Sequence, residues 1–240
     1  MSLRLCHCKF EGDKIGVYLG SKKWGEYILL KEPYCLKCAC PGVALENCQW
    51  HEDDYGFERI YAMGAYLKRE IIKERGKGDF LSSHILGLKQ YPRYAEPLGL
   101  GMVECMKNRY LELMESELIV PIPKFPTELK VATDPKGIKY NQAEELANII
   151  SSNINIASLN ILKKTREQSM RSLGEADRRE VVKGLYGIGN SAGLRDKGIL
   201  LVDDVSTSGA TVSECAKVLI DAGAKTVNVL VAGRNTDTRV

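Results

Sequence analysis

The sequence predicts an α/β protein in which helices flank a parallel sheet. Two observations carry this prediction. Apolar runs at 118–122, 199–202 and 226–232 have the length and composition of buried strands. Amphipathic stretches of helical period lie between them, one after Asn141 and one after Thr211. Strands that alternate with helices in this way usually form a parallel sheet with right-handed crossovers.

Residues 1–54 are predicted to form a small separate module. Six of the eight cysteines precede residue 50, and the composition changes at the acidic stretch 52–54. Apolar residues alternate at Ile15, Val17 and Leu19, the stretch GSKK can turn, and 27–30 can return as a second strand. We therefore expect a hairpin with cysteines at its ends.

Residues 55–118 have a mostly helical pattern, with a short strand around 59–65. We interpret them as a hood-like linking region that leads into the main domain at 119–240. In that domain, 118–122 is the first core strand. Asn141 can cap the following helix with Glu144 at its third position, and one face of that helix is apolar.

Composition restricts the class of protein. The formal net charge is only +3, so no strong overall field favours nucleic acid or an anionic membrane. No apolar run approaches the length of a membrane span, and the first thirty residues lack a signal-peptide core. We expect a cytoplasmic protein. In a reducing compartment, clustered cysteines indicate metal ligands rather than disulfides, and the isolated Cys105 and Cys215 fit core positions.

The run ILLVDDVSTSGAT at 199–211 predicts a sugar-phosphate site. A buried strand ends in two carboxylates, Asp203 and Asp204, and a loop of small and hydroxyl-bearing residues leads into a helix. Backbone N–H groups at a helix N-terminus bind phosphate, and paired carboxylates accept hydrogen bonds from ribose hydroxyls. Either part alone is common in structural turns and helix caps, but the ordered combination favours a ribose 5-phosphate site. The predicted cradle consists of Val205, Ser206, Thr207, Ser208, Gly209, Ala210 and Thr211.

This run resembles the phosphoribosyl pyrophosphate (PRPP) signature of type I phosphoribosyltransferases. Further stretches occur in the order seen in ComF-like proteins, which combine such a domain with an N-terminal zinc module. The chain departs from the family pattern at two points. It has KGIKYNQ where the family commonly has Arg-Gly-Phe before Asn-Gln, and it has Ser208 where the family commonly has Thr. The stretches that carry the resemblance are ILGLKQYPRYAEPLG, IVPIPKF, YNQAEELA and KKTREQSMRSLGEADRREVVKGLY.

The resemblance implies roles for individual residues. Asp203 and Asp204 would hold the ribose hydroxyls, and 205–211 would surround the 5-phosphate. The turn at Lys124 would face Mg²⁺-bound diphosphate. The stretch 165–179 is similar to a mobile loop that closes over substrate; its alternative interpretation is a solvated helix of mixed charge.

The implied function is a Mg²⁺-dependent phosphoribosyltransferase, in which a nitrogen nucleophile, such as a nucleobase-like acceptor, displaces pyrophosphate from PRPP. Basic residues and loop closure would stabilise the leaving group and exclude water. No general base for the acceptor is evident, and we interpret His84 as structural or solvated. The alternative is a non-enzymatic ComF-like accessory protein in DNA uptake or processing that binds single-stranded nucleic acid or a DNA-processing partner. Oligomerisation is compatible with either.

The cysteine spacing predicts a structural zinc ion. Cys6, Cys8, Cys35 and Cys38 flank the expected hairpin and can form a tetrahedral thiolate site, giving a zinc-ribbon-like module. A second possible set is Cys35, Cys38, Cys48 and His51, which also has ligand spacing. Each set supplies four Cys or His ligands, so the zinc ion would have no open coordination position for catalysis.

Overall fold

A four-stranded parallel sheet forms the centre of the molecule in a computed structural model, which describes residues 6–30, 56–75, 79–131, 137–168, 180–190 and 193–235. Its strand order is β4-β11-β10-β5, and every neighbouring pair is parallel. The predicted parallel sheet is thereby confirmed. The strands span Arg59–Tyr66 (β4), Leu118–Pro121 (β5), Gly198–Ser206 (β10) and Thr226–Asn235 (β11).

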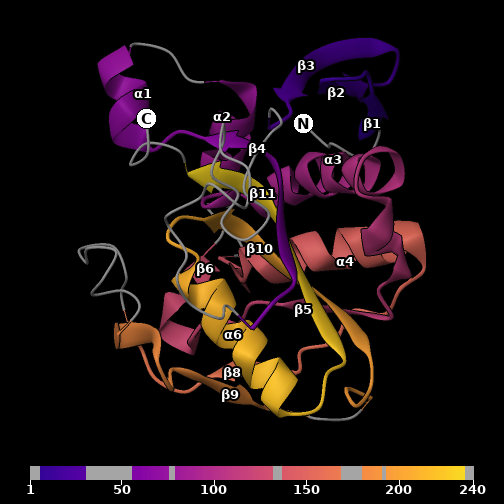
Figure 1. Cartoon of the computed structure of the whole chain (residues 1–240). Coiled ribbons are helices and arrows are strands. Elements are labelled where there is room, and N and C mark those ends of the chain that lie inside the picture. The colour runs from indigo at the N-terminus through magenta and orange to yellow at the C-terminus, as the bar shows by residue number, and fades with distance from the viewer. Residues whose placement is uncertain are drawn as a thin grey trace, which may run out of the picture.

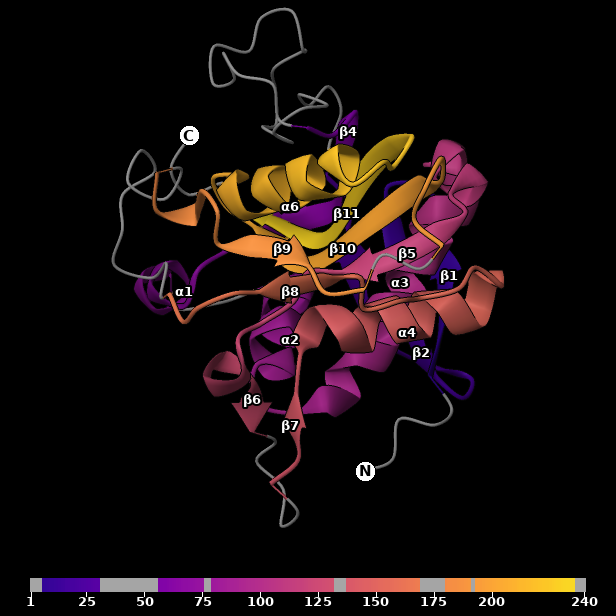
Figure 2. The ribbon, with the colours of Figure 1, turned by 90° about the horizontal axis from the view of Figure 1, so that it is seen from below.

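Helices cover both faces of this sheet (Figures 1 and 2). Helix α6 lies on one face, and α2, α3 and α4 lie on the other, as Figure 2 shows. Short 3-10 turns at Pro92–Tyr94, Leu111–Glu115 and Pro126–Glu128 connect elements. The helices are Arg69–Arg75 (α1), Phe80–Leu88 (α2), Ala95–Asn108 (α3), Gln142–Ile154 (α4) and Ala210–Asp221 (α6).

Asn141 begins α4 as the sequence predicts. Its side-chain oxygen accepts a hydrogen bond from the Ala143 N–H at 3.3 Å, which is a helix cap. Its amide nitrogen donates to the carbonyl of Ile122 at 2.8 Å. One buried side chain therefore both starts the helix and ties it to the chain that leaves β5.

The N-terminal residues form a three-stranded antiparallel sheet in the order β1-β2-β3. The predicted hairpin is present as β2 and β3, but its return strand covers 22–28 rather than 27–30, and Cys6 and Cys8 lie within the additional strand β1. This sheet packs on the helices: the Phe80 ring lies 5.4 Å from Trp24, and Tyr27 Oη lies 2.7 Å from His84 Nδ1. Burial lowers the pKa of His84 to about 4, so the ring is neutral and structural. The strands are Cys6–Phe10 (β1), Lys14–Leu19 (β2) and Lys22–Ile28 (β3).

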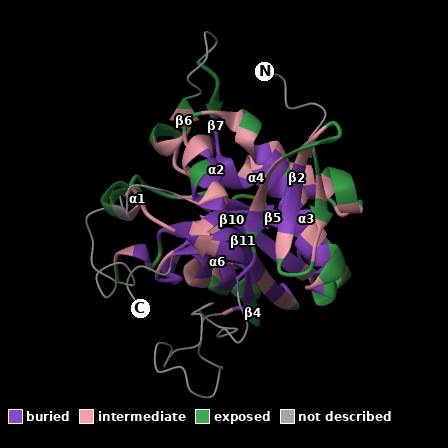
Figure 3. Ribbon diagram, turned by 90° about the horizontal axis from the view of Figure 1, so that it is seen from above, coloured by how far each residue is buried: buried purple, intermediate pink, exposed green. Residues whose placement is uncertain are grey.

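The core lies between the sheet and its helices, where buried residues concentrate (Figure 3). Cys105 and Cys215 are fully buried in it, as expected. Two small two-stranded antiparallel sheets flank the central sheet: Lys130–Val131 (β6) with Lys139–Tyr140 (β7), and Leu162–Lys164 (β8) with Tyr186–Ile188 (β9). Within the described ranges, no helix has the length and apolarity to cross a membrane.

Candidate functional site

The candidate site lies at the carboxyl edge of the central sheet, where ligands of open parallel sheets usually bind. Strand β10 carries Asp203 and Asp204 near its end, and α6 begins only four residues after the strand, at Ala210. Gly209 makes the connection with a φ of 81°, a left-handed conformation that favours glycine. The sequence predicted the helix from residue 212; it begins two residues earlier because this glycine lets the chain turn directly into it.

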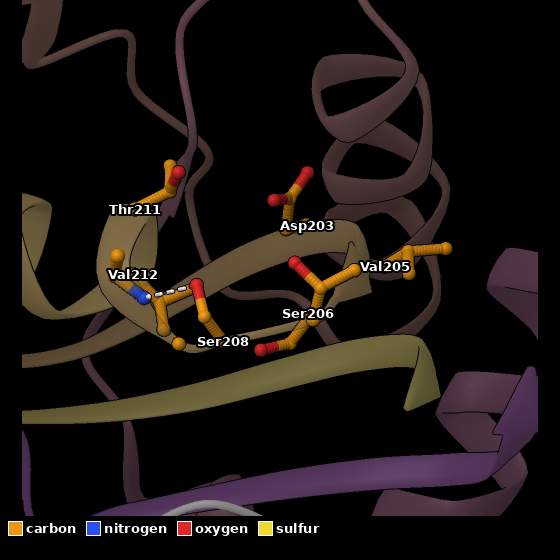
Figure 4. Close-up of a pocket in the computed structure, with 9 residues that line it drawn as sticks. Asp203, Val205, Ser206, Ser208, Thr211 and Val212 are labelled. Atoms are coloured by element: carbon orange, nitrogen blue, oxygen red, sulfur yellow. Dashed lines mark hydrogen bonds between the residues drawn. The ribbon is translucent and has the colours of Figure 1, made fainter. Parts of the chain in front are cut away.

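A small pocket occupies this connection. It is lined by Asp203 and residues 205–212 and holds about 50 Å³, enough for a small polar group. Figure 4 shows the Asp203 carboxylate and the Thr211 side chain directed to the same side of the loop. All seven predicted cradle residues line the pocket together with Asp203.

The first turn of α6 borders the pocket. The first N–H groups of any helix have no partner within the helix, and the helix dipole places partial positive charge there. Gly209 supplies no side chain to cap them, although Ser208 Oγ accepts from the Ala210 N–H at 3.4 Å. The pocket wall is therefore rich in hydrogen-bond donors, as an anion site requires.

Asp204 is buried beside the pocket, but does not line it. Its carboxylate accepts from the Val205 N–H at 3.0 Å, and Asp203 accepts from the Asp204 N–H at 2.9 Å. Burial, and then the charge of Asp204, raise the pKa of Asp203 to about 8. Burial acts in the same direction on Asp204, but the charges of Lys124 and Lys89, together with hydrogen bonds from Asp203 and the Val205 N–H, lower its pKa. The two carboxyls therefore titrate together, and the pair keeps one proton to a higher pH than an isolated aspartate would.

Lys124 follows β5 and lies close enough for its charge to oppose the rise in the pKa of Asp203 and to lower that of Asp204. The turn that carries it is held by Glu128, whose carboxylate accepts from the Phe125 N–H at 3.1 Å. The structure therefore brings together the two segments that the sequence placed on the ribose and diphosphate sides. Lys89, from the end of α2, is a second cation at this edge that the sequence did not indicate.

The same Glu128 carboxylate also contacts β8. Lys164 Nζ lies 2.6 Å from both carboxylate oxygens, and the Gln168 N–H donates to one of them at 3.1 Å. Despite its burial, these partners lower the pKa of Glu128. The predicted mobile stretch 165–179 is described only as far as Gln168; the rest lies outside the described residues.

Arg234 is a further residue of this edge that the sequence analysis missed. It lies beside Ser206 in the register of β11 and β10, and it is 1% exposed. Its Nη1 donates to the carbonyl of Thr207 and, at 3.3 Å, to Ser206 Oγ. The sequence ended this strand at 232, whereas β11 continues to Asn235. A charged residue directly after an apolar strand was the available signal.

Comparisons with known proteins bear on this arrangement. A family model described as "Phosphoribosyl transferase domain" matches residues 141–239, which contain β10, the pocket and β11. "Competence protein F" of Haemophilus influenzae is 29% identical over 241 residues, covering 95% of each chain. The chain is therefore similar to phosphoribosyltransferase domains over residues 141–239, and to Competence protein F over nearly its whole length. The crystal structure of TT1426 from Thermus thermophilus is 12% identical, with a TM-score of 0.34, and covers 57% of this chain and 72% of that one.

The predicted zinc ligands fall partly within the described residues. Cys6 and Cys8 lie on the same face of β1 and their thiols interact, so they are placed as two ligands of one ion would be. The Cys8 thiol also contacts the Pro97 carbonyl at 3.5 Å. The remaining candidates, Cys35, Cys38, Cys48 and His51, lie outside the described residues. Within the part that is described, no three metal-binding side chains cluster, and the zinc ion stays a prediction.

Proposed function

We propose that this protein is a Mg²⁺-dependent PRPP-binding phosphoribosyltransferase that displaces pyrophosphate with a nitrogen nucleophile. One observation carries the proposal: a buried acidic pair stands at the end of a parallel strand, next to a pocket lined by a glycine-containing loop and a helix N-terminus. The pocket suits a 5-phosphate, and the neighbouring carboxylates suit ribose hydroxyls. The match of residues 141–239 to a phosphoribosyl transferase domain supports this assignment.

The polar groups of the site also suit a magnesium ion. Asp203 and Asp204 supply carboxylate oxygens, which Mg²⁺ prefers as ligands, and a cation would offset the cost of their buried charge. When bound, Mg²⁺ would neutralise the diphosphate leaving group. Lys124 would hold the diphosphate by charge, and the acidic pair would stabilise positive charge that develops on the sugar ring.

Calorimetry with PRPP and Mg²⁺ tests the proposal. Wild type should bind, and the double variant Asp203→Ala with Asp204→Ala should not. Asp221→Ala is the matched control, because Asp221 is exposed at the opposite end of α6, about 16 Å along the helix. Absence of binding by the folded wild-type chain would overturn the proposal. Release of pyrophosphate, measured with a panel of nitrogen bases, then distinguishes an enzyme from a protein that only binds PRPP.

A second candidate is a cytoplasmic accessory protein in DNA uptake or processing that binds single-stranded DNA or a DNA-processing partner. The likeness to a protein named for competence, over 95% of both chains, favours it. Binding of single-stranded DNA that weakens steeply with salt, together with no pyrophosphate release, would support this candidate over the enzyme.

A structural zinc ion held by Cys6, Cys8, Cys35 and Cys38 completes the proposal. Two of these thiols already lie side by side on β1, which fits half of a tetrahedral site. Metal analysis of the purified protein should give one zinc ion per chain, and Cys35→Ser should remove it. Cys48→Ser distinguishes the second possible ligand set, because it removes zinc only if Cys48 is a ligand.

A further inference from the structure

Arg234 is a buried cation beneath the pocket loop. Its side chain is the largest of those that are fully buried in the described structure. An arginine stays charged in proteins, and burying a charge is costly unless hydrogen bonds and opposite charges compensate it. A core position at the end of an apolar strand does not by itself need this residue, so its contacts indicate what it does there.

Those contacts go to the two residues that begin the pocket loop. Nη1 of Arg234 donates to the main-chain carbonyl of Thr207 and to Ser206 Oγ. Ser206 and Thr207 line the pocket, whereas Arg234 does not. Arg234 therefore contacts the pocket loop without itself lining the pocket.

The bond to the Thr207 carbonyl fixes the orientation of the next peptide group. In a planar trans peptide the carbonyl and the following N–H point in opposite directions. Because the Thr207 carbonyl points at Arg234, the N–H of Ser208 points away from it, toward the pocket side of the loop. The arginine thus turns a donor, rather than an acceptor, to the space that an anion would occupy.

We infer that Arg234 is a positioning residue for the 5-phosphate: it holds the Ser206–Thr207 segment so that the Ser208 N–H is free to face the pocket, and it places a positive charge next to the loop. This inference rests on the proposed function. It assigns Arg234 to the 5-phosphate side, because these two hydrogen bonds join it to the loop between β10 and α6.

The test compares three ligands by calorimetry with Mg²⁺: PRPP, ribose 5-phosphate and pyrophosphate. Arg234→Gln should weaken PRPP and ribose 5-phosphate by at least about tenfold, because the loop loses a charged hydrogen-bond donor. Pyrophosphate binding should stay within about twofold, since that ligand lacks the 5-phosphate. Arg59→Gln is the matched control, because Arg59 is an exposed arginine at the other end of the sheet, paired with Glu112.

Arg234→Lys separates orientation from charge. Lysine keeps the charge but lacks the planar fork, so it should restore only part of the lost affinity for ribose 5-phosphate. It also serves as the test variant if Arg234→Gln does not fold, as judged by circular dichroism. Unchanged ribose 5-phosphate affinity in the folded variant, or an equal loss for pyrophosphate, would overturn this inference alone. A wild-type chain that binds none of the ligands would overturn the proposed function as well.

Discussion

Replacing Asp203 with asparagine should stabilise the free protein, and the gain should grow with pH. Burial and the neighbouring Asp204 raise the pKa of Asp203 from 3.8 to about 8. In the unfolded chain the same carboxyl loses its proton near pH 4. Between about pH 4 and pH 8, folding of wild type therefore requires uptake of one proton, and its stability falls as pH rises. Asparagine does not titrate, and its side-chain oxygen can still accept from the Asp204 N–H.

The size of the effect follows from this proton. A difference of one bound proton changes the free energy of unfolding by about 1.4 kcal/mol per pH unit. Between pH 5 and pH 7, both within the window between the two pKa values, the advantage of Asp203→Asn over wild type should therefore widen by about 3 kcal/mol. The same variant should bind PRPP more weakly, because the carboxylate that would hold the ribose is lost.

Urea denaturation at pH 5, 6 and 7 measures this difference. Ser208→Ala is the control, because it removes a buried neutral group from the same pocket and should keep a constant difference from wild type over this range. An Asp203→Asn advantage that does not change between pH 5 and pH 7 would show that Asp203 is already ionised in the folded protein. That result would refute the shared-proton description of the acidic pair.

Two further substitutions test the supports of the site. Lys164→Met should cost about 3 kcal/mol in urea denaturation at pH 7, because it leaves the largely buried Glu128 carboxylate without its cation. Lys183→Met, which breaks an exposed pair with Glu180, should cost at most about 0.5 kcal/mol; similar costs would contradict the role of burial. Gly209→Ala should cost about 1–2 kcal/mol, because alanine is strained at a φ of 81°. An alanine variant as stable as wild type would show that the loop adopts another conformation.

Much of the sheet could be predicted because a strand buried on both faces is an uninterrupted apolar run. Strands β5, β10 and β11 have this character. The Asn141 helix cap could be predicted for a similar reason, because it depends only on residues next to each other in the chain. The sequence predicted β4 as a strand, but it did not predict that β4 pairs with β11. Pairing between segments that lie more than 150 residues apart leaves no local pattern, and the proposed division into domains stays a prediction.

The candidate site was predictable to the extent that it is continuous in the chain. Residues 203–211 follow one another, so the sequence alone presents their chemistry as one pattern. Arg234 and the Lys164–Glu128 pair could not be found in this way, because each contact joins elements between 27 and 36 residues apart. Only the register of β10 and β11 shows that Arg234 lies beside Ser206.

The features at this sheet edge oppose stability in the free protein, and this is an argument for function. Burial of an acidic pair with one raised pKa and burial of an arginine next to the loop are costly, whereas the left-handed backbone of Gly209 only shapes the turn. A turn that only linked β10 to α6 would need none of these, because a neutral Asn or Ser could cap the helix at lower cost. An incoming anion and divalent cation would offset the first cost directly and use the donors that the other two features position. Unfavourable features therefore cluster where a bound ligand would compensate them. This clustering is expected of a binding site rather than of a structural turn.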